Sequence, residues 1–150
     1  MPKIVFIGQQ PNSYEDEGTP LPMRPGSTGK RIVQMMGITE ESFLNSFNVL
    51  NVSPFHDCDG FSPEYWFRNA QNILPLLEGR RVVLLGSRVA EAFGFNRTDY
   101  DYASWFDHPR ENILFSVIPH PSGRNHLYNN PEMHEMVRSF LDMCWTLRGA

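Results

Sequence analysis

The sequence has only two cysteines, Cys58 and Cys144, and they do not form a Cys-x-x-Cys pair. Two thiols are too few for a disulfide framework, a zinc finger or a four-cysteine cluster. Cys144 lies within an apolar helical pattern, so we expect it to be a thiol of the core.

Long apolar runs are also absent, since no run approaches the roughly 18–20 residues that a membrane helix needs. The first ten residues, MPKIVFIGQQ, lack the apolar region and the cleavage site of a signal peptide. We therefore expect a cytoplasmic protein with no contact to membranes.

An excess of basic residues is lacking as well, because 13 Lys and Arg face 17 Asp and Glu, for a net charge of −4. This charge argues against a strong non-specific nucleic-acid binder, in which neutralised phosphates supply most of the affinity. A local basic face stays possible, because Arg24, Lys30, Arg31 and Arg124 lie beside polar loops.

What the chain does have is enough apolar residues for a core, 41% of its 150 residues, and a length that fits one domain over 1–150. Four short runs of aliphatic and β-branched residues predict strands covered on both faces. These runs are Lys3–Gly8, Phe47–Val52, Arg81–Gly86 and Ile113–Ile118.

Helical patterns separate and follow the strands. They cover Ser27–Ile38, Ser62–Gly79, Ser87–Gly94 and Pro131–Leu147. Alternating strands and helices predict a parallel, layered α/β sheet. The stretch Tyr100–Asn112 is the least regular, and we expect it to be an ordered loop or an insertion.

In such sheets, ligands bind beyond the carboxyl ends of the strands. Three of the four segments that follow the predicted strands are strongly polar: GQQPNSYEDEG, NVSPFHDCDG and PHPSGRNH. We expect them to meet at one edge of the sheet and to form the site.

Three simpler interpretations of these loops have weaker support. The segment GSTGK lacks the first glycine and the final Ser or Thr of a phosphate-binding Walker loop. The segment His56–Asp59 does not have a known spacing of metal ligands, so we expect no metal there. A serine hydrolase would need a Gly-x-Ser-x-Gly elbow, which the chain lacks.

Two motifs together are more specific, GQQPN after the first strand and HPSGRN after the last one. They resemble the first motif and the His-Pro-Ser motif of the uracil-DNA glycosylase superfamily. The second motif is closest to the single-strand-selective branch, whereas the segment after the first resembles the iron–sulphur branch. VLNVSPF and VVLLGSRVAEAFG resemble the second and third strand regions, so the similarity covers most of the chain.

This resemblance implies a four-stranded parallel sheet between two helical layers, in a three-layer α/β/α fold. It also implies a DNA partner and hydrolysis of the bond between a flipped base and its deoxyribose. His120 would hydrogen-bond the base as negative charge develops on it, and Asn51 would read the pyrimidine edge. Ser122 and Gly123 would bind phosphates. Arg124 would be the wedge that fills the gap left by the flipped base, or would pair a phosphate. Neighbouring candidates are Gln9 for base binding, and Asn125, Ser53 and Lys30 for DNA binding.

The chain departs from the family pattern at three positions. Gln10 stands where an Asp or Asn positions the water, and glutamine cannot act as a general base. Asn12 and Glu15 are the nearest substitutes. Leu21 replaces the aromatic that stacks on uracil, and Asn12 replaces the tyrosine that excludes thymine. The cysteines of the iron–sulphur branch are absent, so no cofactor is expected.

These features predict a monomeric, monofunctional DNA glycosylase that excises uracil or a pyrimidine modified at C5. The lack of a catalytic lysine motif favours hydrolysis over lyase chemistry. One alternative is a glycosylase for hypermodified phage bases, such as glucosylated 5-hydroxymethylcytosine, that acts in anti-phage defence. The other alternative is a non-catalytic DNA- or base-binding member of the same fold.

Overall fold

The computed structural model describes residues 2–10, 27–55, 62–121 and 125–148. A five-stranded sheet lies at its centre, with the strand order β2-β1-β3-β5-β4. The strands are β1 (Val5–Gly8), β2 (Asn48–Asn51), β3 (Arg81–Leu85), β4 (Phe106–Asp107) and β5 (Leu114–Ile118). Strands β1, β2, β3 and β5 are parallel, so the four predicted strands are confirmed.

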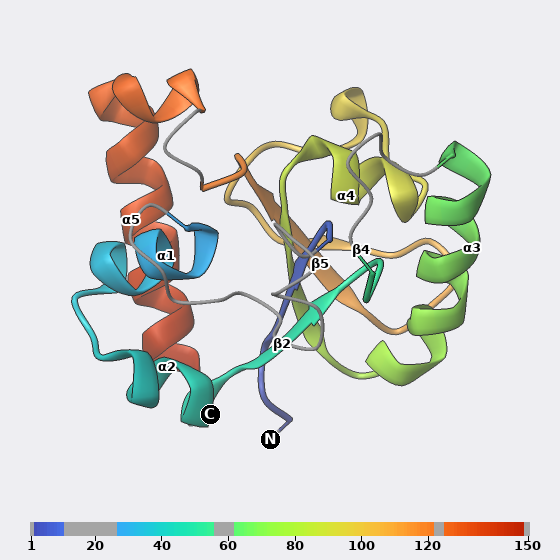
Figure 1. The fold of residues 1–150 in the computed structure, drawn as a ribbon, viewed down its shortest axis with the longest axis horizontal. Helices are drawn as coiled ribbons and strands as arrows, with labels where there is room; N and C mark the ends of the chain where they lie inside the picture. Colours follow the sequence, from blue (N-terminus) through green and yellow to red (C-terminus); the bar gives the residue numbers. More distant parts are fainter. Residues whose placement is uncertain (1, 11–26, 56–61, 122–124, 149–150) are drawn as a thin grey trace.

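Helices cover both faces of the sheet, as Figure 1 shows. On one side lie α1 (Thr28–Met36), α2 (Glu40–Ser46) and α5 (Pro131–Leu147), and on the other lie α3 (Pro63–Ile73) and α4 (Ser87–Ala92). Short 3₁₀ turns complete the chain: η2 (Leu74–Leu77), η3 (Arg97–Asp99) and η4 (His126–Asn129). The expected three-layer α/β/α arrangement is therefore confirmed.

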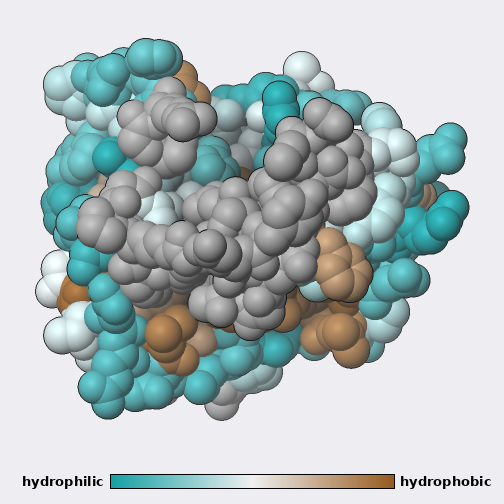
Figure 2. Space-filling view, viewed as in Figure 1, coloured by the Kyte–Doolittle hydropathy of each residue, from teal (hydrophilic) through white to brown (hydrophobic). Residues whose placement is uncertain are grey.

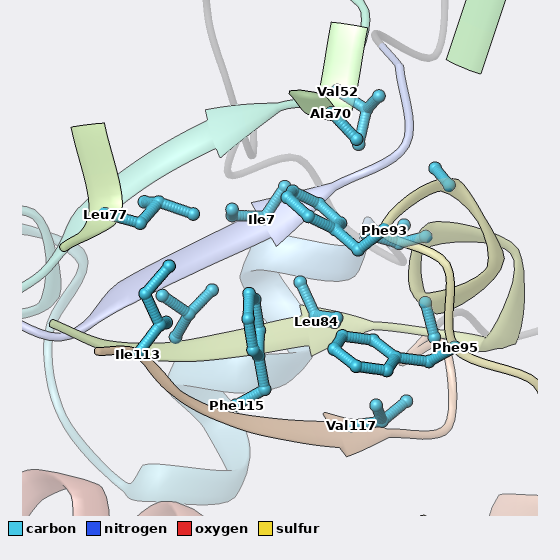
Figure 3. Packing of buried hydrophobic residues seen from close by; sticks show 14 of the residues in the cluster. Ile7, Val52, Ala70, Leu77, Leu84, Phe93, Phe95, Ile113, Phe115 and Val117 are labelled. Atoms are coloured by element: carbon cyan, nitrogen blue, oxygen red, sulfur yellow. The ribbon is translucent and has the colours of Figure 1, made fainter. Parts of the chain in front are cut away.

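The core explains why the strand sequences are apolar at nearly every position. Side chains of one strand alternate between two buried clusters, so that Val5 and Ile7 pack towards α3 and α4, while Phe6 packs towards α1, α2 and α5. Figure 3 shows the first cluster, in which Phe115 of β5 lies beside Leu84 of β3 and contacts Phe93. Each fully buried side chain of this size contributes about 1.5–3 kcal/mol relative to an exposed one.

The helix starts follow from their caps. The hydroxyl of Ser27 accepts a hydrogen bond from Lys30 N at the start of α1, and that of Ser62 accepts one from Tyr65 N at the start of α3. The single helix expected over Ser62–Gly79 is instead α3 followed by η2, because Pro75 lacks the N–H that an α-helix would need.

Two elements differ from the sequence expectation. The expected sheet of four parallel strands is corrected by β4, a two-residue strand that pairs antiparallel with β5 inside the stretch expected to be irregular. The short helix α2 was not predicted either. Its one buried residue is Phe43, which packs against Phe6 and Phe47.

The surface carries scattered apolar side chains, which appear in Figure 2 as separate brown patches among polar residues. No helix among the described residues is both long and apolar enough to cross a membrane. Cys144 is fully buried, as expected for a core thiol.

Candidate active site

The carboxyl ends of four parallel strands meet at one edge of the sheet. In the strand register, Gly8 lies opposite Asn51 and Leu85 lies opposite Ile118. The chain runs from β1 outwards to β2 and then back across β1 to β3, so the strand order reverses at β1. Ligands of open α/β sheets bind beyond the strand ends at such a reversal. This edge is therefore the candidate site.

His120 follows β5 at this edge and is partly buried. Its Nε2 lies 3.4 Å from the hydroxyl oxygen of Thr28, the first residue of α1. Burial lowers the pKa of His120 below its ordinary value near 6.5. The imidazole is consequently neutral at neutral pH, so it carries one N–H donor and one nitrogen acceptor.

Two side chains fix the backbone around His120. Asn125 Nδ2 donates to the carbonyl of His120 at 2.9 Å, and Asn125 Oδ1 accepts from Leu127 N at 3.1 Å. The buried hydroxyl of Tyr128 donates to the carbonyl of Pro119. The side chain of Asn125, which we expected at the DNA, thus braces the loop that carries His120.

Gly86 lies next to His120, at the turn from β3 into α4. Its φ of 109° and ψ of 163° lie in a region that is open almost only to glycine. A Cβ at this position would lie 3.1 Å from the Cβ of His120. The backbone of the β3 turn and the histidine are therefore packed directly against each other.

The loops after β1 and β2 are joined by backbone hydrogen bonds. Val52 N donates to Gly8 O at 2.9 Å, and Ser53 N donates to Gln9 O at 3.0 Å. Gln10 follows directly and is partly buried, as is Asn51 at the end of β2. The pairing thus brings the predicted residues Gln9, Asn51 and Ser53 to one edge.

Two predicted DNA-binding side chains are engaged within the protein. Ser53 is fully buried, and its hydroxyl lies 2.9 Å from the hydroxyl of Tyr65 and from the carbonyl of Phe55. Lys30 Nζ pairs with a carboxylate oxygen of Glu40 in α2 at 2.9 Å. DNA contacts by these two residues remain predictions.

The other predicted residues lie outside the described part of the chain: Asn12, Glu15, Leu21, Ser122, Gly123 and Arg124. The same holds for the histidine and acidic residues of 56–59 that were weighed as a metal site. Within the described ranges, no three His, Cys, Asp or Glu side chains are grouped as metal ligands.

A cavity of about 670 Å³ lies elsewhere, between α3, the end of α4 and β4. Phe67, Phe93 and Phe95 line it together with His108. Because β4 pairs with the first residues of β5, this cavity lies towards the amino ends of the strands. None of the site residues described above lines it.

Sequence reasoning missed Thr28, Gly86 and Tyr128. A signal existed for the first two, because Thr28 follows a serine cap and Gly86 ends a strand that belongs to the proposed edge. Their proximity to His120 could not be read from the sequence, since Thr28 and His120 are 92 positions apart.

Comparison of the sequence with models of protein families identifies the class of the protein. The model of the uracil DNA glycosylase superfamily matches residues 1–142. The chain belongs to this superfamily. No curated protein matches the chain.

Membership in the uracil DNA glycosylase superfamily confirms the predicted family and the fold class. The assignment of single motifs to two branches stays a prediction. The superfamily generally comprises DNA glycosylases, which act on DNA.

Proposed function

We propose that the protein is a monofunctional DNA glycosylase that hydrolyses the bond between a flipped pyrimidine and its deoxyribose and leaves an abasic site. The observation that carries this proposal is His120 at the carboxyl edge of the sheet. It is partly buried, burial lowers its pKa, and Asn125 holds its carbonyl group. The superfamily match over residues 1–142 supports the same reaction.

The electrostatic role of His120 follows from its protonation state. When the bond to the sugar breaks, negative charge develops on the departing base, and a fixed hydrogen-bond donor stabilises that charge. A neutral imidazole N–H serves as such a donor. Removing one donor of this kind costs about 10²–10³ in rate in other enzymes.

Recognition of the base is assigned to Asn51, with Gln9 beside it. A carboxamide donates to a carbonyl oxygen and accepts from an N–H, which matches the O4 and N3–H of uracil. The cytosine edge presents the opposite pattern, which the same carboxamide matches after a half-turn that exchanges its oxygen and its nitrogen. Asn51 is the last residue of β2, and its backbone is fixed by pairing with Gly8.

The attacking water needs a residue that orients it. Gln10 is next to the β1 end and is suited to orient a water, but its amide does not accept a proton. We therefore keep Asn12 and Glu15 as the additional candidates, with Glu15 as the carboxylate. Phosphate contacts are assigned to Ser122, Gly123 and Arg124.

The excised base is uracil or a pyrimidine modified at C5. Asn12 stands where a bulky tyrosine excludes C5 substituents in the classical branch, and this replacement favours a wider pocket. We extend this proposal to bases as large as glucosylated 5-hydroxymethylcytosine, which the protein would remove from phage DNA in defence against phage.

Gln10 also motivates a second candidate function, a DNA- or base-binding protein without catalysis. Such a protein would bind DNA through the same edge and would never produce abasic sites.

The experiment is cleavage of end-labelled oligonucleotides that each carry one test base, followed by alkali to break abasic sites. The panel holds uracil, 5-hydroxymethyluracil, 5-hydroxymethylcytosine and its glucosylated form, in single and double strands. His120→Ala is the test variant, and His108→Ala, which changes a histidine of the distant cavity, is its matched control. Cleavage that falls by about 10²–10³ in His120→Ala and is unchanged in His108→Ala supports the enzyme. DNA binding without cleavage by any member favours the binding protein.

A further inference from the structure

The backbone around His120 is fixed by hydrogen bonds, but these bonds do not fix the orientation of its imidazole ring. Asn125 and Tyr128 fix the carbonyl groups of His120 and Pro119, and Gly86 packs against the Cβ of His120. The side chain keeps its torsional freedom, which includes rotation about the Cβ–Cγ bond, broad and roughly two-fold for histidine. A side-chain contact must therefore select the orientation of the ring.

Thr28 provides that contact. Its hydroxyl oxygen lies 3.4 Å from Nε2, and among the described residues no other side-chain polar atom lies within hydrogen-bond distance of the ring. A ring turned by half a rotation would present a carbon to this hydroxyl in place of a nitrogen and would lose the hydrogen bond.

The position of Thr28 is itself well fixed. Thr28 is the first residue of α1, and the preceding Ser27 caps that helix by accepting from Lys30 N at 3.2 Å. The next residue, Gly29, is buried, and Ile32 of the same helix is fully buried in the core. Because the helix is anchored at both points, the backbone of Thr28 is held in place beside the imidazole.

We propose that Thr28 is a positioning residue that selects the ring orientation and the tautomer of His120. Its contribution to catalysis rests on the proposed glycosylase function, whereas its contact with the ring does not. Thr28 acts through His120 and is not itself assigned to the base.

The charged side chains of α1 near the ring are engaged with other residues, so the contact with Thr28 is the polar contact that orients the ring. On α1, Arg31 lies over the ring of Tyr128, 5.8 Å from its centroid, and Lys30 pairs with Glu40. Burial lowers the pKa of His120, and no charged group of the described residues contributes to that shift. The amino end of α1, where Thr28 lies, adds a partial positive charge that disfavours the imidazolium form.

The first test is nitrogen NMR of the histidine rings in the free protein, with His120 assigned by the loss of its signals in His120→Gln. Thr28→Val keeps the shape of threonine and removes the hydroxyl, whereas Thr28→Ser keeps the hydroxyl. Thr146→Val removes an exposed hydroxyl on α5 and is the matched control. We expect Thr28→Val alone to change the tautomer ratio and the pKa of His120. A rise of the pKa would show that Thr28 donates to Nε2, and a fall that it accepts.

The second test is single-turnover cleavage of the best substrate of the panel. Loss of one neutral hydrogen bond predicts a rate about fivefold lower in Thr28→Val, with Thr28→Ser within about twofold of the unchanged protein. Identical His120 signals in Thr28→Val and the unchanged protein would overturn the inference, as would an unchanged cleavage rate. Altered His120 signals in Thr28→Val, together with no cleavage of any substrate by the unchanged protein, would contradict the proposed glycosylase function. They would still support the role of Thr28 in orienting the ring.

Discussion

Replacing Gly86 with alanine tests the packing behind His120 at a single position. The backbone of Gly86, at φ 109° and ψ 163°, lies in a region where a side chain costs about 1–3 kcal/mol. The new Cβ would also lie 3.1 Å from the Cβ of His120, so one of the two must move by a few tenths of an ångström. Both effects reduce stability, and the second also displaces the proposed catalytic ring.

The assay for this variant is urea unfolding combined with cleavage. With a slope of about 2 kcal/mol/M, the expected loss lowers the urea midpoint by about 0.5–1.5 M at an unchanged slope. Cleavage by the folded variant should fall at least tenfold, because small displacements of a catalytic group are costly.

The matched control is Gly94→Ala at the end of α4. Gly94 also has a positive φ, of 90°, but nothing lies within 4 Å of a Cβ placed there. This variant should lose stability and keep its cleavage rate. If Gly86→Ala unfolds at the same urea concentration as the unchanged protein, or if both variants lose cleavage equally, the packing argument is refuted.

Three further predictions concern the loop that carries His120. Because burial lowers the pKa of His120 in the folded protein, the unfolded chain takes up this proton first as the pH falls below about 6.5. The free energy of unfolding should therefore decline there, and urea titrations of His120→Gln at several pH values should show a smaller decline. Tyr128→Phe leaves the carbonyl of Pro119 without its donor and should cost about 1–3 kcal/mol in urea unfolding; an unchanged midpoint would count against the bond. His120→Ala should lower single-turnover cleavage by about 10²–10³ while DNA binding in a filter assay stays within a few fold.

The sequence predicted the parallel strands because apolar runs suit burial on both faces. Strands β1, β3 and β5 meet this condition almost throughout, whereas β2 is only partly buried. Phe6 and Ile7 illustrate it, since neighbouring side chains enter opposite core clusters. The strand β4 was not predictable in this way. It has only two residues, and its pairing depends on β5 and not on a pattern of its own.

Helix α2 carried a weak signal that was not used. Thr39 caps it, and Glu40 and Glu41 stand in its first turn, as is favourable at the positive end of a helix. With seven residues and Phe43 as its one buried side chain, the segment shows too little periodicity to stand out. Its stability comes from packing of Phe43 against Phe6 and Phe47, which is a property of the folded chain.

The site residues that lie in sequence motifs were predictable, whereas the contacts between segments far apart in the sequence were not. Asn51 is the last residue of β2 and His120 follows β5, so the polar residues at the strand ends identified the edge. Thr28 approaches His120 only because α1 packs beside the sheet, and Asn125 faces inwards because the carbonyl of His120 needs a donor. Contacts of this kind depend on the three-dimensional arrangement.

The most direct test of the account is product analysis after reaction in water enriched in ¹⁸O. The account predicts that the protein releases a free base and an abasic strand in equal amounts. It also predicts that the label enters the deoxyribose and not the base, and that both products form about 10²–10³ more slowly in His120→Ala. Stable binding of the same DNA with neither product formed, by a protein of native stability, would contradict it.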